Sequence, residues 1–155
     1  MSLESVRRFL AAHAPDIAVI ETAASSATVT EAAAAHGVEP GRIAKTLSLR
    51  IANRVVLLVA AGTARLDNQK AKQAFGAKPR MLGADEVAAL TGHPVGGVSP
   101  FGLASPLAVY CDMSLRAFDE VLPAAGSTNS AVRIAPLRLA DLVGAEWVDA
   151  CRTAD

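Results

Sequence analysis

Cysteine is scarce in this sequence, and long apolar segments are absent from it. The two cysteines, Cys111 and Cys151, are separated by 39 residues and have no second Cys or His at ligand spacing, which argues against a disulfide scaffold and a zinc site. The richest apolar run, residues 55–61, is seven residues long, whereas a membrane-spanning helix needs about 20. The charged opening stretch also lacks the apolar core of a secretory signal. We therefore expect a cytoplasmic protein without a membrane partner or a bound metal.

Familiar catalytic signatures are missing as well. The sequence contains no Gly-x-Ser-x-Gly nucleophile elbow, and its glycines do not precede the Lys-Ser/Thr pair of a phosphate-binding loop. Of the three histidines, His13 and His36 fall at predicted helix ends, where capping or solvated roles are common, and His93 borders a glycine-rich segment. Cys111 lies in a predicted strand and is expected to be a buried structural thiol. A Ser, Cys or His nucleophile is therefore not indicated.

The charges of this chain balance, but they are unevenly distributed. The chain has 155 residues, 52% of them hydrophobic and 19% charged, with 15 basic and 15 acidic side chains, so we expect one folded domain over residues 1–155. Residues 42–80 hold nine cations and one acid, a formal charge of +8, which leaves −8 for the rest. Such a segment favours contacts with nucleic-acid phosphates; a solvated basic face is the alternative. The nine cations are Arg42, Lys45, Arg50, Arg54, Arg65, Lys70, Lys72, Lys78 and Arg80.

Hydrophobic periodicity and turn signals divide the chain into short helices and strands. Thr28 and Glu31 form a capping box for an alanine-rich helix that ends at Gly37. The mixture of hairpins and helices predicts an α/β or α+β fold, with a mixed, barrel-like β-sheet surrounded by helices. Further helices are predicted over residues 2–13, 67–75, 84–90 and 136–143, a helical turn over 114–118, and strands over 17–21, 43–51, 55–61, 107–111, 121–122 and 132–135.

Lys45 is the residue whose position most needs an explanation. Residues 43–51 alternate in a strand pattern that places Lys45 on the same face as four aliphatic side chains. An ammonium on an apolar face loses its hydration unless it has a partner or faces a cavity, so we predict that Lys45 lines a site. The alternatives are that it reaches water from the sheet edge, or that the register is shifted by one residue.

The segment TGHPVGGVSPFG, residues 91–102, contains four glycines and two prolines and is expected to form a shaped loop. Amides unhindered by side chains suit the stabilisation of a developing oxyanion or the binding of a phosphate. A tight connection without a ligand is the alternative for any glycine-rich turn. The loop is therefore a candidate site only in combination with other residues.

Taken together, several segments resemble the YbaK/EbsC aminoacyl-tRNA deacylases, which are similar to the editing insertion of bacterial prolyl-tRNA synthetases. The resemblance spans most of the chain, and the order of the segments makes it specific. The segments are Thr30-Glu31-Ala32-Ala33 with Gly37-Val38, Ile43-Ala44-Lys45-Thr46-Leu47, Gly96-Gly97-Val98-Ser99-Pro100-Phe101-Gly102, Gly126-Ser127 and Ile134-Ala135-Pro136.

The resemblance implies a mixed-sheet barrel, a lysine at position 45 that is needed for activity, and a Gly-x-x-x-Pro loop at residues 96–100. It also implies hydrolysis of a wrong amino acid from the 3′ end of a transfer RNA, most specifically tRNA(Pro), by a free-standing domain without a metal or organic cofactor. An aminoacyl-tRNA synthetase is a further expected partner. We therefore predict Lys45 and Gly97 as catalytic residues. The predicted substrate-binding residues are Thr46, Gly96, Val98, Ser99, Pro100, Gly126 and Ser127.

Some positions depart from the family pattern and leave the edited amino acid open. His93-Pro94-Val95 precedes the glycines, and residues 127–130 with Arg133 replace the acidic pattern of the cysteine-specific members. The nucleophile is then water or a group on the substrate. Two alternatives remain at this point: a non-catalytic RNA- or nucleotide-binding module, and a regulatory domain that contacts a synthetase.

Overall fold

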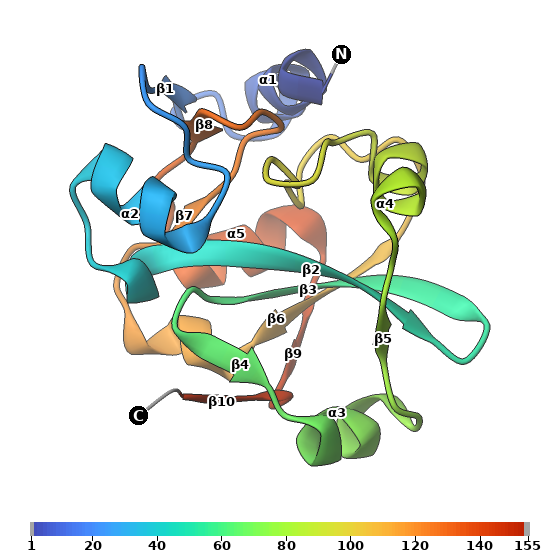
Figure 1. Ribbon diagram of the computed structural model, residues 1–155. Helices are drawn as coiled ribbons and strands as arrows, with labels where there is room; N and C mark the ends of the chain where they lie inside the picture. The colour runs from blue at the N-terminus through green and yellow to red at the C-terminus, as the bar shows by residue number, and fades with distance from the viewer. Residues whose placement is uncertain (1, 154–155) are drawn as a thin grey trace.

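A six-stranded mixed sheet forms the centre of the computed structural model, which describes residues 2–153. Its main path runs β5-β2-β3-β6-β9, with β7 beside β2, and two further two-stranded sheets pair β1 with β8 and β4 with β10 (Figure 1). The strands are β1 (Ile20–Glu21), β2 (Ile43–Ile51), β3 (Arg54–Ala61), β4 (Ala64–Leu66), β5 (Arg80–Met81), β6 (Ala108–Asp112), β7 (Leu122–Pro123), β8 (Ser130–Ala131), β9 (Glu146–Val148) and β10 (Cys151–Thr153).

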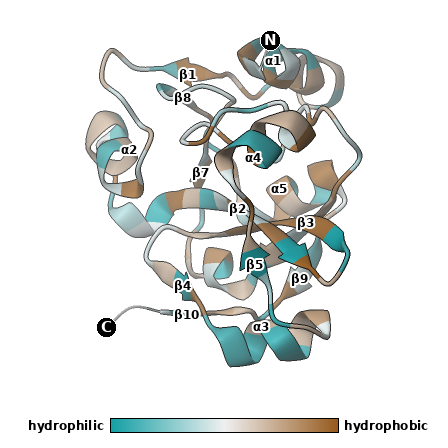
Figure 2. Cartoon of the chain, turned by 45° about the vertical axis from the view of Figure 1, so that its right-hand side comes forward, coloured by the Kyte–Doolittle hydropathy of each residue, from teal (hydrophilic) through white to brown (hydrophobic). Residues whose placement is uncertain are grey.

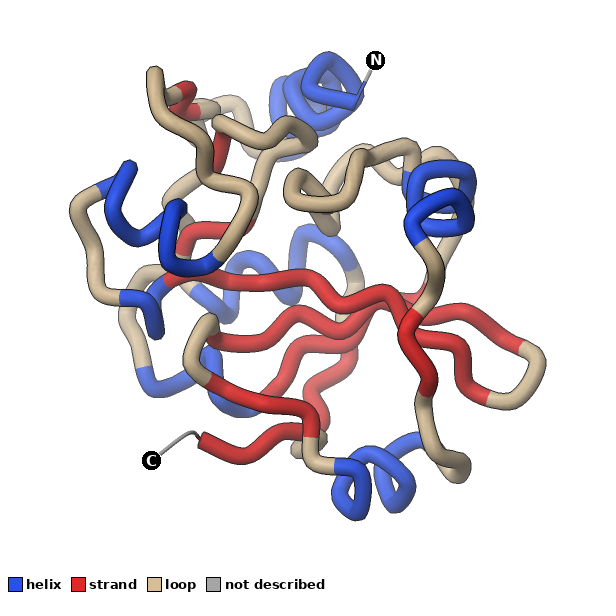
Figure 3. Tube along the Cα trace, viewed as in Figure 1, coloured by secondary structure: helices blue, strands red, loops and turns tan. Residues whose placement is uncertain are grey.

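Short helices surround this sheet, as the tube in Figure 3 shows. Their residues are α1 (Ser2–His13), α2 (Val29–His36), α3 (Asn68–Phe75), α4 (Ala84–Thr91) and α5 (Pro136–Val143), with two 3₁₀ turns at η1 (Pro40–Arg42) and η2 (Met113–Ala117). Figure 2 shows that hydrophilic residues dominate α3, which lies at the surface. No helix among the described residues is both long enough and apolar enough to cross a bilayer.

Local signals account for the positions of the helix ends. Thr28 is the N-cap of α2, and its hydroxyl accepts the amide of Glu31 at 3.1 Å. Gly37 ends the same helix in the left-handed region, with φ 68°, where glycine pays no steric penalty. Asp67 caps α3 by accepting the amides of its first turn. The predicted bounds of α1 and α5 are confirmed.

The hairpin of β2 and β3 is the backbone of the fold. The two strands are antiparallel, with Ala44 opposite Ala61 and Ile51 opposite Arg54. Residues Leu57 to Ala60 of β3 are fully buried, because β3 lies between β2 and the parallel strand β6 and has its side chains covered on both faces. The strict alternation predicted for residues 43–51 is confirmed as a strand with these bounds.

The α/β class and the mixed sheet are confirmed, but the sheet is not a closed barrel. Within residues 2–153 it is open, with β5 and β9 at its ends. The strand predicted at residues 17–21 is shortened to β1, and residues 132–135 contribute an isolated bridge from Ile134 to Val121 in place of a strand. Five strands of two or three residues, β4, β5, β8, β9 and β10, were not predicted, because such short segments carry no periodicity of their own.

Candidate functional site

A cavity of about 230 Å³ lies between β2, α2, the glycine-rich loop and the β7–β8 region. Side chains from distant parts of the sequence form its wall, and most of them are small or aliphatic. They are Ser26, Ala27, Thr28, Val29, Ala32, Ile43, Ala44, Lys45, Thr46, Ser48, Met81, Leu82, Val87, Val95, Gly96, Val98, Leu122, Ala124, Ser130 and Ala131. Three of the predicted substrate-binding residues, Thr46, Gly96 and Val98, therefore meet Lys45 in one wall.

The glycines of the loop allow two close backbone approaches. A Cβ on Gly96, whose φ is 89°, would lie 2.9 Å from the Cβ of Ala27. A Cβ on Gly97 would lie 2.8 Å from the carbonyl carbon of Ser127. Real Cβ atoms do not come this close to other heavy atoms, so both positions need glycine. The loop therefore packs against the segment before α2 and against the late turn, residues 126–129. These contacts close the cavity on one side.

The backbone amide of Gly97 is engaged within the loop itself. It donates to the carbonyl of Pro94 at 2.9 Å and closes a tight turn. To act as an oxyanion donor, as predicted, this amide would have to release Pro94. Gly96 and Val98, by contrast, flank Gly97 and line the cavity.

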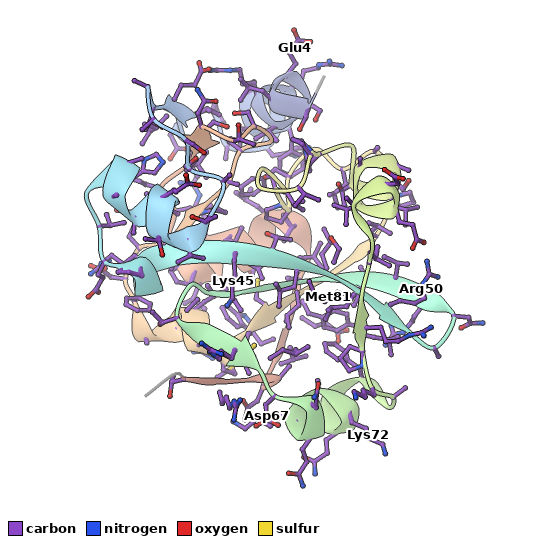
Figure 4. All side chains as sticks on the ribbon, in the orientation of Figure 1. Glu4, Lys45, Arg50, Asp67, Lys72 and Met81 are labelled. Atoms are coloured by element: carbon purple, nitrogen blue, oxygen red, sulfur yellow. The ribbon has the colours of Figure 1, made fainter. Side chains whose placement is uncertain are left out.

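Lys45 has its side chain on the opposite face of β2 from Thr46, since neighbouring residues of a strand point to opposite faces. Its ammonium donates to the main-chain carbonyls of Gly62, at 3.4 Å, and of Ala64, which lie at the start of β4 (Figure 4). Burial lowers the pKa of Lys45 below its ordinary value, and nearby Arg65 acts in the same direction. Lys45 lies opposite Ala60 of β3 and is half-buried, with its ammonium held by main-chain carbonyls of the protein.

Three other predicted residues, Ser99, Pro100 and Gly126, lie outside the cavity wall. Ser99 is buried, and its hydroxyl accepts the amide of Phe101 at 3.2 Å; the buried Pro100 follows it in the loop. Gly126 accepts the hydroxyl of Ser2 through its carbonyl. None of these residues contributes to the cavity wall.

The late turn leads to Ser130, which lines the cavity wall and is hydrogen-bonded to Ser127. Ser127 Oγ lies 2.5 Å from Ser130 Oγ and donates to Asn129 Oδ1 at 3.0 Å. Ser130 is fully buried and lines the cavity, whereas Ser127 does not. Arg133, which departs from the family pattern, bonds to Glu120 at 3.2 Å.

His93 has a structural place in the loop. Its ring is fully buried, with Nε2 2.9 Å from the Phe101 carbonyl and Nδ1 2.6 Å from Ser2 Oγ. Burial lowers the pKa of His93, although the bond to Phe101 opposes this effect. The imidazole joins the loop to α1 and does not line the cavity.

The two thiols are also away from the cavity wall. Cys111 and Cys151 are free and buried, and burial raises the pKa of each thiol to about 12. Both are therefore protonated at neutral pH, which agrees with the structural thiol predicted at Cys111. Residues 2–153 contain no group of three or more His, Cys, Asp or Glu side chains placed to hold a metal ion.

Folding partly neutralises the basic segment 42–80. Acids from outside the segment pair with three of its cations: Arg42 with Asp119 at 2.8 Å, Arg50 with Glu86, and Lys70 with Asp149 at 3.2 Å. The net positive charge of this segment is therefore partly compensated by neighbouring acids on the folded surface. The exposed cations outside these pairs are Arg54, Arg65, Lys72, Lys78 and Arg80.

Sequence reasoning missed several wall residues. Ser48 could have been found, because it lies two positions after Thr46 and shares its face of the strand. Ala27 and Ser130 carried no such signal. They reach the cavity only because the segments before α2 and at β8 fold over β2.

An open mixed sheet with a partly open, mainly apolar cavity beside a glycine-rich loop defines a small α/β domain, and cavities of this kind are the usual form of ligand sites. The chain matches the model of the family described as "Aminoacyl-tRNA editing domain" over residues 23–142. The protein belongs to this family, which confirms the resemblance seen in its motifs.

Individual relatives extend the similarity over the whole chain. The protein is 47% identical over 154 residues to the uncharacterised protein YwhH of Bacillus subtilis, a match that covers 98% of both chains. It is 29% identical over 116 residues to EbsC of Enterococcus faecalis, named as a candidate Cys-tRNA(Pro)/Cys-tRNA(Cys) deacylase, with 73% of this chain and 70% of EbsC covered. A crystal structure of a candidate trans-editing enzyme for prolyl-tRNA synthetase superposes with a TM-score of 0.90, at 35% identity and 97% coverage of both chains.

Proposed function

We propose that this protein hydrolyses the ester between a wrongly attached small amino acid and the 3′ end of a transfer RNA, most specifically tRNA(Pro). The observation that carries the proposal is the cavity of about 230 Å³, whose wall contains residues of both β2 and the glycine-rich loop. Membership of the editing family and the similarity to EbsC and to a prolyl-tRNA trans-editing candidate support it. The protein would act in the cytoplasm as a free-standing domain, alone or beside a synthetase.

In this proposal the aminoacyl group enters the cavity and the terminal adenosine stays at its rim. Met81 and Val95 are 61% and 59% exposed although both line the cavity, so they offer apolar surface to a base. The ester carbonyl receives hydrogen bonds from the loop amides of Gly96 and Val98, which line the cavity, and from the Gly97 amide once it releases Pro94; these donors would stabilise the oxyanion of the tetrahedral intermediate.

Lys45 supplies positive charge next to the reacting ester or the terminal phosphate. A lysine ammonium has three donors, and the carbonyls of Gly62 and Ala64 take two of them. The third remains for the substrate. Because the partly buried ammonium is less hydrated than a surface lysine, its charge acts more strongly on a nearby carbonyl or phosphate.

The nucleophile in the proposed reaction is a water molecule or a hydroxyl of the substrate. The wall contains serine and threonine hydroxyls but no imidazole, thiol or carboxylate that would activate them as a base. With water, the oxygen adds to the ester carbonyl carbon, and the intermediate collapses to the free amino acid. The ribose oxygen leaves with a proton as the hydroxyl of the intact tRNA.

A non-catalytic binding module with the same cavity is the second candidate. It is favoured by the engagement of both predicted catalytic groups inside the protein: Gly97 with Pro94, and Lys45 with the carbonyl of Ala64. Such a module would bind the aminoacyl end and protect its ester from hydrolysis.

A deacylation panel separates these candidates. We expect the purified protein, at a tenth of the substrate concentration or less, to release free amino acid from tRNA(Pro) charged with one or more small non-cognate amino acids over many turnovers. Prolyl-tRNA(Pro) is the control and should stay charged. Slower loss of every ester than in buffer alone would identify the binding module and contradict the hydrolase.

The exposed cations of residues 42–80 provide a test of the tRNA partner. We expect tRNA affinity to fall by at least about tenfold between 50 and 200 mM salt, since each phosphate contact releases counterions. Fluorescence anisotropy with labelled tRNA measures the slope, and Lys72→Gln combined with Lys78→Gln should reduce it. An affinity independent of salt would show that phosphate contacts do not hold the tRNA.

A further inference from the structure

Strand β2 contributes two neighbouring hydroxyl side chains to the cavity wall. Thr46 and Ser48 are two positions apart, so they share one face of the strand, and both line the cavity. Ser48 is 4% exposed. The Thr46 hydroxyl is buried and has no hydrogen-bond partner within residues 2–153. Because burying a hydroxyl without a partner is unfavourable, a ligand that supplies the partner gains affinity at this position.

The other hydroxyls of the wall are already engaged. Thr28 caps α2 by accepting a backbone amide of its first turn at 3.1 Å. Ser26 Oγ donates to the Thr128 carbonyl at 3.2 Å, and Ser130 Oγ lies 2.5 Å from Ser127 Oγ. Thr46 differs from them because its buried hydroxyl makes no hydrogen bond within residues 2–153, so hydrogen bonding to a ligand side chain falls first to the pair on β2. A rotation about χ1 interchanges the hydroxyl and methyl of a threonine, which is enough to turn Thr46 Oγ1 toward a ligand.

The cavity is small and offers little to a charged side chain. Lys45 is the one charged residue in its wall; two donors of its ammonium are bound to the carbonyls of Gly62 and Ala64, and the third is assigned to the reacting ester or the terminal phosphate. A buried charge without a partner is strongly disfavoured. The volume of about 230 Å³ is also below the roughly 300–1,000 Å³ of sites for drug-sized ligands. The side chain that enters is thus small and uncharged.

We propose that the cavity selects a small amino acid that carries a hydroxyl group, seryl or threonyl, over alanyl and cysteinyl. This inference rests on the proposed function, because it places the aminoacyl group in the cavity. The substrate hydroxyl exchanges hydrogen bonds with Thr46 Oγ1 and Ser48 Oγ. An alanyl group leaves both without a partner, and a thiol replaces the substrate hydroxyl with a weak donor and acceptor. A site that hydrogen-bonds a substrate hydroxyl discriminates well against analogues that lack it.

Amide analogues test the selectivity independently of catalysis. In these compounds serine, threonine, alanine or cysteine is joined to 3′-amino-3′-deoxyadenosine, so the protein binds them without hydrolysing them. We expect isothermal titration calorimetry to give about tenfold or greater preference for the seryl and threonyl amides over the alanyl amide. Deacylation of the four corresponding aminoacyl-tRNAs, on one tRNA body, is measured in parallel.

Substitutions on β2 assign the preference to its hydroxyls. Thr46→Val keeps the side-chain shape without the hydroxyl, and Ser48→Ala removes the second one. Each should lower the ratio of seryl to alanyl affinity by about threefold to tenfold. Thr153→Val, at the exposed end of β10, is the matched control and should leave the ratio as it is, with thermal midpoints reporting the folding of all three.

The outcomes separate this proposal from the proposed function. Equal affinity for the seryl and alanyl amides overturns the selectivity even if deacylation is observed, and so does an unchanged ratio in both Thr46→Val and Ser48→Ala. A seryl preference without any deacylation supports the selectivity and overturns the hydrolase. Absence of binding by all four amides overturns the assignment of the cavity to the aminoacyl group, and the selectivity with it.

Discussion

Lys45→Met should lower kcat/KM for deacylation by about 100-fold or more. The methionine keeps an unbranched apolar side chain on β2 but removes the positive charge that the proposed mechanism places beside the ester, and losing one such electrostatic contact typically costs about 10²–10³ in rate. Steady-state deacylation of mischarged tRNA measures the effect. Arg8→Met, on the exposed surface of α1, removes a cation outside both the cavity and residues 42–80 and is the matched control.

The fold should tolerate Lys45→Met. The substitution relieves the desolvation that lowers the pKa of this lysine, and it leaves the carbonyls of Gly62 and Ala64 without their donor. These effects oppose each other, so we expect the free energy of unfolding to change by no more than about 1–2 kcal/mol. Lys45→Arg should restore little activity, because the guanidinium differs from the ammonium in length and shape. Near-normal kcat in folded Lys45→Met would rule out the proposed role.

Gly97→Ala should lower both activity and stability. The added Cβ would lie 2.8 Å from the main chain of Ser127, so the loop or the late turn must move apart. Overpacking of this kind costs about 1–3 kcal/mol, and displacement of the neighbouring Gly96 and Val98 opens the cavity wall. We expect kcat/KM to fall by about tenfold or more, because misplacement of positioning groups by about 1 Å has costs of up to about 10²-fold.

Gly83→Ala is the matched control for this glycine. Gly83 precedes α4, has φ −71°, and has no heavy atom within 4 Å of the position its Cβ would take. Chemical denaturation and deacylation assays of both variants should therefore show a loss only in Gly97→Ala. Equal behaviour of the two would mean that the contact with Ser127 is not needed to hold the loop.

The glycine-rich loop shows how far the sequence could lead toward the site. Its composition indicates a shaped backbone, and the order of motifs identifies the family. Neither indicates that the Gly97 amide would be held by Pro94 at 2.9 Å. That bond depends on how the loop turns between Ala27 and Ser127, which are about 70 and 30 residues away. The catalytic role of Gly97 therefore remains a prediction. The structure gives another reason for a glycine at this position, which is the close approach of its main chain to that of Ser127.

Lys45 is a second example, on a strand, of what the sequence could and could not predict. The alternation of residues 43–51 placed the lysine on the same strand face as four aliphatic side chains and left a position that reaches water open as an alternative. It could not show that the ammonium would reach two carbonyls of the β3–β4 turn, or that Thr46 and Ser48, whose side chains leave the other face of the strand, would line the same cavity as Lys45. A period of two distinguishes the faces of a strand, but it does not tell which segment covers each face.

The sequence by itself determined the elements whose signals are local. Caps at Thr28, Asp67 and Gly37 act over one helical turn, and the alternation of β2 acts within one strand, so these features follow from neighbouring residues. Tertiary structure decided the short strands β4, β5, β8, β9 and β10, the pairing of basic residues 42–80 with distant acids, and the cavity itself. Each of these needs contacts between residues far apart in the chain, and such contacts form only when the whole core is packed.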